Sequence, residues 1–268
     1  TESDALRLQK DIEYLHDWSL SNKMKFHPDK CKVLSVSGKI SETLSLISVL
    51  PFFNFIYSMG GISLDYVDQE KDLGVIVASN LEWNEQCSKV LSKANQKLGM
   101  CRRNCYFVRD LNRRRVLYLT LVRSQFEHCS VLWRPVTRTQ ISKLEGLQKR
   151  AIKWILHEEF FSYSPSTYIQ KCRQLKIIPI EDRFDFLDLI FFFKIVKQHI
   201  PVNLPSYLQR FQGQSRLRNS HLDHLCYVSS ITPQKSSNAF ARNFFFRTHT
   251  KWNHIPLDIR EVESITEF

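Results

Sequence analysis

Glycine is scarce in this chain, the cysteines form no close pair, and no apolar run is long enough to cross a membrane. Only 7 of the 268 residues are glycine, whereas 43% are hydrophobic, so neither a fibrous repeat nor a disordered chain is expected. The most apolar run, Phe186 to Ile200, contains Asp188, Lys194 and Lys197 and is shorter than a bilayer span. We therefore predict a buried core helix there.

The seven cysteines are odd in number and scattered, without a C-x-x-C pair and without a signal-peptide pattern before them. This usage favours free thiols in a reducing compartment. One hypothesis places a zinc ion between Cys101, Cys105, His128 and Cys129, although their spacing matches no common zinc finger. The alternative, which we favour, is that these cysteines are small buried apolar side chains.

Positive charge is concentrated in one stretch, Trp83 to Lys153. This stretch holds 16 of the 38 lysines and arginines but only 4 of the 27 acidic residues, so it carries +12 while the rest of the chain carries −1. Such a concentration predicts a surface that meets a polyanion. The alternative is a solvated helical face.

Residues 1–80 predict a small α+β region. Apolar spacing indicates an amphipathic surface helix over residues 4–21, and alternation indicates a short strand over residues 31–37. After a loop over residues 35–50, Gly60-Gly61 permits a tight hairpin turn, with which residues 73–78 should pair. The sheet of this region should be incomplete by itself.

Three helices are predicted next. The first starts at Asn80 or Asn84 and buries a stripe from Cys87 to Cys101; the second, residues 116–126, is apolar nearly all round; the third covers residues 138–156. Together they predict a bundle with a basic outer surface. The arginines at positions 113–115 oppose the dipole of the second helix, which favours an anionic partner for them.

A third region follows a boundary near Phe160 to Pro165, and prolines separate its predicted helices. Helices are predicted over residues 166–175, 181–198 and 238–252. The spacing makes Phe184, Leu187, Phe191 and Ile195 core residues, and it makes Arg183 with Asp185 and Asp188 an ion-paired surface. For Trp252 and Phe244 to Phe246 we favour packing over stacking on bases.

We therefore predict a mostly helical α+β fold in three regions: residues 1–80, 81–158 and 159–268. Several collinear blocks in these regions resemble LINE-type (non-LTR, jockey-like) retrotransposon reverse transcriptases, in the part that follows their catalytic aspartates. The blocks are LQKDIEYLHDWSLSNKMKFHPDKCKVL, EKDLGVIV, KANQKLGMCRRN, LYLTLVRSQFEHCSVLWRP and LEGLQKRAIKWI, and the tail RNFFFRTHTKWNHIP with ESITEF agrees. The resemblance covers nearly the whole chain.

The resemblance implies the end of a palm with its primer-grip hairpin, a helical thumb and a helical tail. Lys30 takes the place of the lysine in the family's F-N-x-x-K pattern, where it would act as a general acid; His27 replaces the usual Asn, and a plain solvated lysine is the alternative. Lys71 and Gly74 fall in the primer grip, where backbone approaches nucleic acid; for Gly74 the alternative is a bulge glycine.

A thumb holds the duplex of RNA template and DNA primer by its phosphates. The resemblance therefore implies nucleic-acid contacts, beyond Lys71 and Gly74, from Lys89, Lys93, Lys97, Arg102, Arg103, Arg113, Arg114, Arg115, Lys149, Arg150 and Lys153. The expected partners are that duplex and the rest of the parent polyprotein. The expected location is the nucleus and cytoplasm, with no membrane partner.

The catalytic carboxylates of such a polymerase, a Y-x-D-D hairpin and an upstream Asp that hold two Mg²⁺ ions, do not occur in this sequence. The nearest match, Asp65-Tyr66-Val67-Asp68, lacks the order and the context. Because the first residue is Thr1, we expect a fragment of a longer protein that supplies the aspartates and Mg²⁺, and no activity or metal site in this chain alone. The alternatives are a stand-alone nucleic-acid-binding protein derived from such an element and a purely structural helical module.

Overall fold

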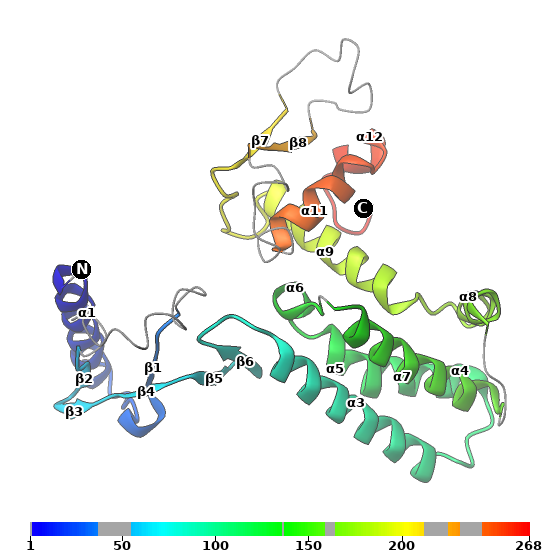
Figure 1. Ribbon diagram of the computed structural model, residues 1–268, viewed down its shortest axis with the longest axis horizontal. Coiled ribbons are helices and arrows are strands. Elements are labelled where there is room, and N and C mark those ends of the chain that lie inside the picture. The colour runs from blue at the N-terminus through cyan, green and yellow to red at the C-terminus, as the bar shows by residue number, and fades with distance from the viewer. Residues whose placement is uncertain (1, 37–54, 136, 159–163, 212–224, 231–242) are drawn as a thin grey trace. The chain divides into compact units, whose positions relative to one another are not determined.

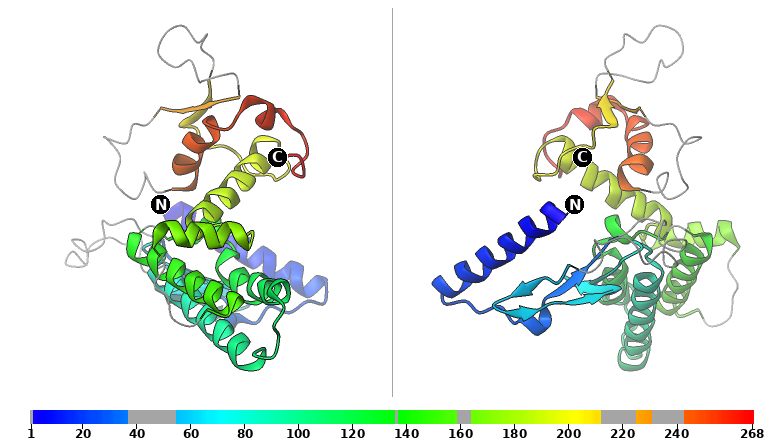
Figure 2. Two further views of the ribbon diagram at one scale, coloured as in Figure 1. Left: turned by 90° about the vertical axis from the view of Figure 1, so that its right-hand side faces the viewer. Right: turned by 60° about the vertical axis from the view of Figure 1, so that its left-hand side comes forward.

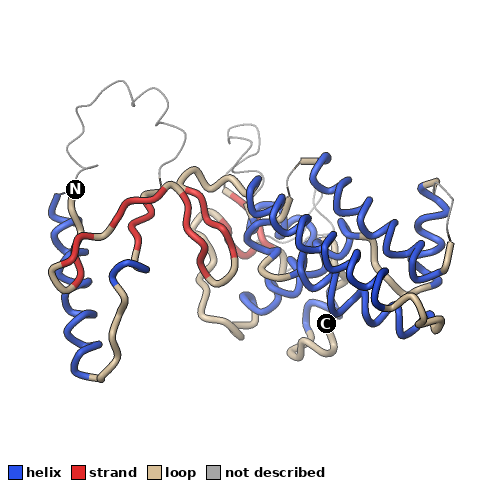
Figure 3. The backbone as a smooth tube through the Cα atoms, turned by 90° about the horizontal axis from the view of Figure 1, so that it is seen from below, coloured by secondary structure: helices blue, strands red, loops and turns tan. Residues whose placement is uncertain are grey.

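The computed structural model describes residues 2–36, 55–135, 137–158, 164–211, 225–230 and 243–268. The fold is mixed α and β and mostly helical, as predicted (Figure 3). The chain divides into two compact units, Thr1–Gln86 and Cys87–Phe268. The division lies near the predicted boundary after residue 80. The second predicted boundary, between residues 158 and 159, adjoins residues that lie outside the described set.

The first unit combines one long helix with short strands. Its elements are α1 (Glu2–Ser21), the 3-10 turn η1 (Pro28–Lys30), β1 (Lys32–Leu34), β2 (Ser58–Met59), β3 (Ile62–Ser63), β4 (Asp65–Val67), β5 (Gln69–Asp72) and β6 (Val75–Ala78). β1 pairs in parallel with β4, whereas β2 with β3 and β5 with β6 are antiparallel pairs. Every sheet in the described residues has two strands. Most of the predicted loop over residues 35–50 lies outside the described residues.

Gly60 and Gly61 form the tight turn that the sequence predicts. They connect β2 and β3 with φ angles of +59° and +80°, and Met59 stands opposite Ile62. Positive φ at both central positions is the backbone of the favoured two-residue hairpin turn, which suits glycine. A Cβ atom on Gly60 would also lie 2.6 Å from Nε2 of His16 on α1. The positive φ of the turn therefore favours glycine here, and a larger residue would also displace the His16 ring.

The expected pairing of residues 73–78 with this hairpin is wrong. β6 pairs with β5, so the two strands form a hairpin of their own. β5 has the sequence QEKD and is exposed along its whole length, and it therefore lacks the apolar alternation by which a strand is predicted. Leu73 and Gly74 form the two-residue turn between β5 and β6, with φ angles of +44° and +93°.

α1 is confirmed, but its predicted apolar stripe does not face the strands. Leu8, Leu15 and Trp18 are 48%, 49% and 45% exposed. The contact with β2 is polar instead: Nε2 of Gln9 donates to the carbonyl oxygen of Ser58 at 3.0 Å, and the Ser58 N–H donates to Oε1 of Gln9 at 2.9 Å. These two bonds fix the helix on the hairpin.

The second unit is built mainly of helices. They are α3 (Asn84–Asn104, which begins in the last residues of the first unit), α4 (Leu111–Leu117), the π-helix η3 (Tyr118–Arg123), α5 (Ser124–Glu127), α6 (Ser130–Trp133), α7 (Arg138–Leu156), α8 (Pro165–Gln174), α9 (Ile180–Val196), α11 (Phe244–Asn253) and α12 (Leu257–Glu261). The strands β7 (Leu208–Arg210) and β8 (Tyr227–Ser229) pair antiparallel. α3, α4, α5 and α7 lie beside one another (Figure 1).

The three predicted bundle helices are confirmed. The stripe from Cys87 to Cys101 is buried on α3, and the second segment buries Tyr118, Val122 and Phe126 completely. That segment is interrupted by η3, which the sequence does not predict. α7 begins where the hydroxyl of Thr137 accepts the N–H of Gln140 at 3.2 Å, as a capping residue does.

In the tail, α9 (yellow-green) and α11 (orange) lie against each other (Figure 2). Aromatic residues of both helices form a core there. Phe192, Phe193 and Trp252 are completely buried, and Leu208 and Tyr227 of the β7–β8 pair are buried beside them. Trp252 Nε1 donates to the carbonyl oxygen of Leu225 at 2.9 Å. The preference for packing over base stacking is therefore confirmed for Trp252. The predicted helix over residues 238–252 is described from residue 243 onward, where Asn243 caps α11.

Arg183, Asp185 and Asp188 are all ion-paired, as predicted, but they do not pair with one another, and Asp188 is not at the surface. Arg183 donates to Glu127 at 2.9 and 3.0 Å. Asp188 is buried, at 2% exposure, and it accepts from Nη1 of Arg134 at 2.7 Å and from Nε of Arg247 at 2.9 Å. Spacing along α9 alone does not reveal these partners, because they come from distant segments.

Candidate nucleic-acid interface

A basic groove of about 700 Å³ opens beside the bundle of the second unit. We call it the basic groove; it is lined by Arg102, Tyr106, Arg114, Arg150, Lys153, Trp154, His157 and Glu158. Four of these side chains are cationic and one is a carboxylate. Because the residues come from α3, from the segment after it, from α4 and from α7, the groove exists only when the bundle is folded.

α3 and α7 position the exposed cations around this groove. Arg102 is exposed near the end of α3 and lines the groove. Arg103, Lys93 and Lys97 are also exposed on α3, but they are not among the residues that line the groove. Arg150 is exposed on α7, and its Nη2 donates to Oδ1 of Asn95 on α3 at 2.7 Å. This bond ties the two helices and holds a guanidinium at the rim.

Three further predicted lysines are half-buried. They are Lys89 on α3 and Lys149 and Lys153 on α7. The ammonium of Lys149 lies 5.1 Å from the ring centre of Tyr168, a cation–π distance, so Lys149 faces α8. Lys153, in contrast, lines the groove. The two predicted lysines of α7 therefore face different surroundings, and only Lys153 is at the groove.

The prediction that the Arg114 side chain faces an anionic partner is wrong. This residue is 4% exposed, and its guanidinium donates to the backbone carbonyl oxygens of Val108 and Trp154 and, at 3.1 Å, of Tyr106. The same group lies 5.0 Å from the ring centre of Trp154. Burial lowers the pKa of the guanidinium. Arg114 therefore holds the loop before α4 against the end of α7.

The other two arginines of this triplet also differ from each other. Arg113 is exposed, and its backbone N–H donates to Oδ1 of Asp110 at 2.7 Å, so that Asp110 caps α4. Arg115 donates from Nε to the Leu175 carbonyl oxygen at 2.6 Å and from Nη2 to that of Lys176 at 3.1 Å. The cap places a negative charge at the helix start, which offsets the unfavourable effect of the arginines on the dipole.

The candidates in the first unit are Lys30, Lys71 and Gly74. Lys30 is exposed at the end of η1, where its N–H donates to the His27 carbonyl oxygen at 2.9 Å. Lys71 is exposed on β5. Gly74 has a φ of +93° in the β5–β6 turn, and this conformation by itself accounts for a glycine. The proposed polymerase roles of all three residues stay predictions.

Among the described residues, no three His, Cys, Asp or Glu side chains gather so that they could hold a metal ion. Cys101, Cys105, His128 and Cys129 therefore do not form the zinc site considered from their spacing. Cys101 is buried on α3, and burial raises the pKa of its thiol. Asp65, from the nearest match to a carboxylate pair, is bound to Lys32 at 2.7 Å.

An exposed aromatic pair, of which Tyr106 lines the groove, was not predicted from the sequence. Tyr106 and Phe107 are 73% and 69% exposed and meet edge to face, with ring centres 5.7 Å apart. The signal in the sequence is a pair of adjacent aromatic residues in the short loop between two basic helices, since exposed aromatic pairs mark interaction sites. His157, which ends α7 in the left-handed conformation, also lines the groove.

Neither a family model, nor a curated protein, nor a solved structure matches the chain. In the described parts of the chain, no helix has the length and apolarity that a membrane span requires.

Proposed function

We propose that the basic groove holds the sugar–phosphate backbone of a nucleic-acid duplex. In this proposal the second unit contains the thumb of a LINE-type reverse transcriptase, whose catalytic aspartates and Mg²⁺ belong to another part of the parent protein. The duplex is an RNA template paired with a DNA primer, and the proposed location is the nucleus and cytoplasm. The sequence blocks that resemble this family support the proposal.

The observation that carries the proposal is the composition of the groove. Arg102, Arg150 and Lys153 converge there from two helices, and Glu158, the one carboxylate of the lining, pairs with Lys171 at 2.6 Å. Cations spaced along a groove bind phosphates without regard to base sequence. Tyr106 adds an exposed ring that suits contact with a sugar or an unpaired base.

The test is a triple variant, Arg102→Gln, Arg150→Gln and Lys153→Gln, whose binding is measured by fluorescence anisotropy over a range of salt concentrations. We expect weaker binding to two duplexes of unrelated sequence by the same factor. We also expect the slope of log K against log salt to fall by about 0.9 for each lost phosphate contact on B-DNA. An RNA–DNA hybrid should bind more tightly than DNA, because an A-like shape and the 2′-hydroxyl are then available.

The matched control is Arg7→Gln, Lys10→Gln and Lys25→Gln, three exposed residues of the first unit with the same loss of charge. A general effect of net charge would lower binding equally in both triple variants. Equal losses, or an unchanged salt slope in the groove variant, would refute the assignment of the groove.

A further inference from the structure

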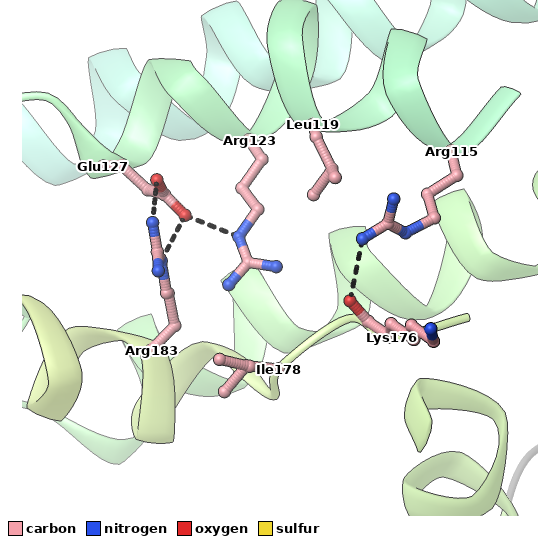
Figure 4. A pocket seen from close by; sticks show the side chains of 7 residues that line it. All are labelled: Arg115, Leu119, Arg123, Glu127, Lys176, Ile178 and Arg183. Carbon is pink, nitrogen blue, oxygen red and sulfur yellow. Dashed lines mark hydrogen bonds and ion pairs between the residues drawn. The ribbon is translucent and has the colours of Figure 1, made fainter. Parts of the chain in front are cut away.

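The second unit has another hollow, of about 250 Å³, which we call the arginine pocket (Figure 4). It lies between the segment α4–η3–α5 on one side and the α8–α9 turn with the start of α9 on the other. Its lining residues are Arg115, Leu119, Arg123, Glu127, Lys176, Ile178 and Arg183. Four of them are basic and one is acidic.

Glu127 is the only acidic residue of this lining, and two arginines share it. Arg183 binds it through Nε at 2.9 Å and through Nη2 at 3.0 Å. Arg123 binds it through Nε at 2.6 Å. One negative charge therefore faces two guanidinium groups, while the positive charges of Arg115 and Lys176 remain in excess.

Arg123 is the decisive residue, because its side chain is only 5% exposed. In the described part of the chain, its two terminal nitrogens have no hydrogen-bond partner, and Figure 4 shows them turned away from Glu127 into the pocket. Among the described side-chain atoms, those that are completely enclosed without a hydrogen-bond partner do not include any atom of Arg123. Its unused donors therefore open into the pocket, where an anion with several acceptor oxygens can accept hydrogen bonds from them.

Arg115 forms a fixed wall of the same space. Its bonds to the carbonyl oxygens of Leu175 and Lys176 leave the guanidinium little freedom. A guanidinium held in this way loses little entropy on binding and presents donors in a fixed geometry. The pocket is therefore a prepared site, with one buried and one immobilised arginine.

We propose that the arginine pocket binds a phosphate group. A carboxylate would bring a single charge and two oxygens, whereas a phosphate monoester carries about −1.5 to −2 and three strong acceptor oxygens. The larger charge and the third oxygen suit an excess of positive charge spread over several guanidinium groups. The phosphate is either that of a small compound or the terminal phosphate of a nucleic-acid strand.

The first experiment is calorimetric titration of the whole chain with inorganic phosphate at constant ionic strength. Arg123→Gln should weaken binding about tenfold or more, because it removes a charge-assisted hydrogen-bond partner. Glu127→Gln should tighten binding several-fold, because it removes the competing carboxylate. Arg173→Gln, at an exposed arginine of α8 outside the pocket, is the matched control and should bind as the natural chain does.

Circular dichroism confirms that each variant folds. If Arg123→Gln does not fold, Arg183→Gln replaces it: this residue is 25% exposed, and without it Glu127 neutralises Arg123 alone, so phosphate should again bind more weakly. No heat of binding by the natural chain up to about 10 mM phosphate would overturn the proposal. The same affinity in the natural chain and the pocket variant would also overturn it.

A second experiment distinguishes the two sources of phosphate. Single-stranded oligonucleotides with a 5′-phosphate or a 5′-hydroxyl are compared in their binding to the natural chain and to Arg123→Gln. A gain from the 5′-phosphate that Arg123→Gln abolishes assigns the pocket to strand ends. If Arg123→Gln binds inorganic phosphate more weakly than the natural chain does, but the 5′-phosphate adds nothing to oligonucleotide binding, the pocket is assigned to a small phosphate compound.

Discussion

Replacement of Asp188 by Asn tests the buried ion-pair network that joins three parts of the second unit. Asp188 on α9 accepts from Nη1 of Arg134, which follows α6, at 2.7 Å, and from Nε and Nη2 of Arg247 on α11 at 2.9 and 3.1 Å. The aspartate is 2% exposed. The Asn side chain has nearly the same shape, so the substitution removes the charge and turns one acceptor into a donor that faces a guanidinium.

The structure sets the expected size of this effect. Removal of one partner from a buried ion pair costs about 3–5 kcal/mol, because the other charge stays buried. Arg134 retains Asp185 at 2.6 Å, whereas both contacts of Arg247 with Asp188 lose their charge. We therefore expect about 3 kcal/mol, the lower end of that range. In a unit of this size, such a loss lowers the melting temperature by about 6–12 °C.

The assay is urea unfolding followed by tryptophan fluorescence, since Trp133 and Trp252 are completely buried in this unit. The control is Asp182→Asn, an exposed residue in the first turn of the same helix. It should cost less than about 1 kcal/mol, the size of a helix-dipole contribution. If Asp188→Asn costs no more than Asp182→Asn, the network does not stabilise the unit and the reasoning fails.

Two further predictions concern the thiols and the missing catalytic carboxylates. At about pH 8, iodoacetamide should modify the partly exposed Cys31, Cys105 and Cys129 before the buried Cys87, because burial raises the pKa of Cys87 to about 11 and leaves little reactive thiolate below that pH. Mass spectrometry measures the order, and equal rates in the folded protein would contradict it. Purified chain should not extend a primed RNA template with Mg²⁺, since its sequence lacks the Y-x-D-D carboxylates. Measurable incorporation of nucleotides would refute this.

The helices of the bundle were predictable because their signals are local. α7 occupies the predicted residues 138–156. Its buried stripe recurs every three to four residues, Thr137 supplies the cap at its start, and it ends at His157. Each of these features depends on residues that are close in sequence, so each can be recognised from the sequence alone.

The contacts between distant segments were not predictable in this way. The apolar spacing of α1 predicted an amphipathic surface helix but not its contact with the strands, which consists of hydrogen bonds between Gln9 and Ser58 of β2. A two-residue polar match between segments 49 residues apart leaves no periodic signal. β5, with the sequence QEKD, likewise becomes a strand only because β6 lies beside it.

The arginine triplet shows why clustered charge in a sequence overestimates clustered charge on a surface. Successive residues of a helix point about 100° apart, and Arg113, Arg114 and Arg115 accordingly face solvent, the loop before α4 and the α8–α9 turn. Two of the three satisfy backbone carbonyl groups, so they contribute packing to the +12 stretch and few contacts to a duplex. Cations on separate helices, such as Arg102 and Arg150, instead converge at one groove. The salt dependence of duplex binding should therefore follow the cations of the basic groove, and it should be smaller than the charge of the whole stretch implies.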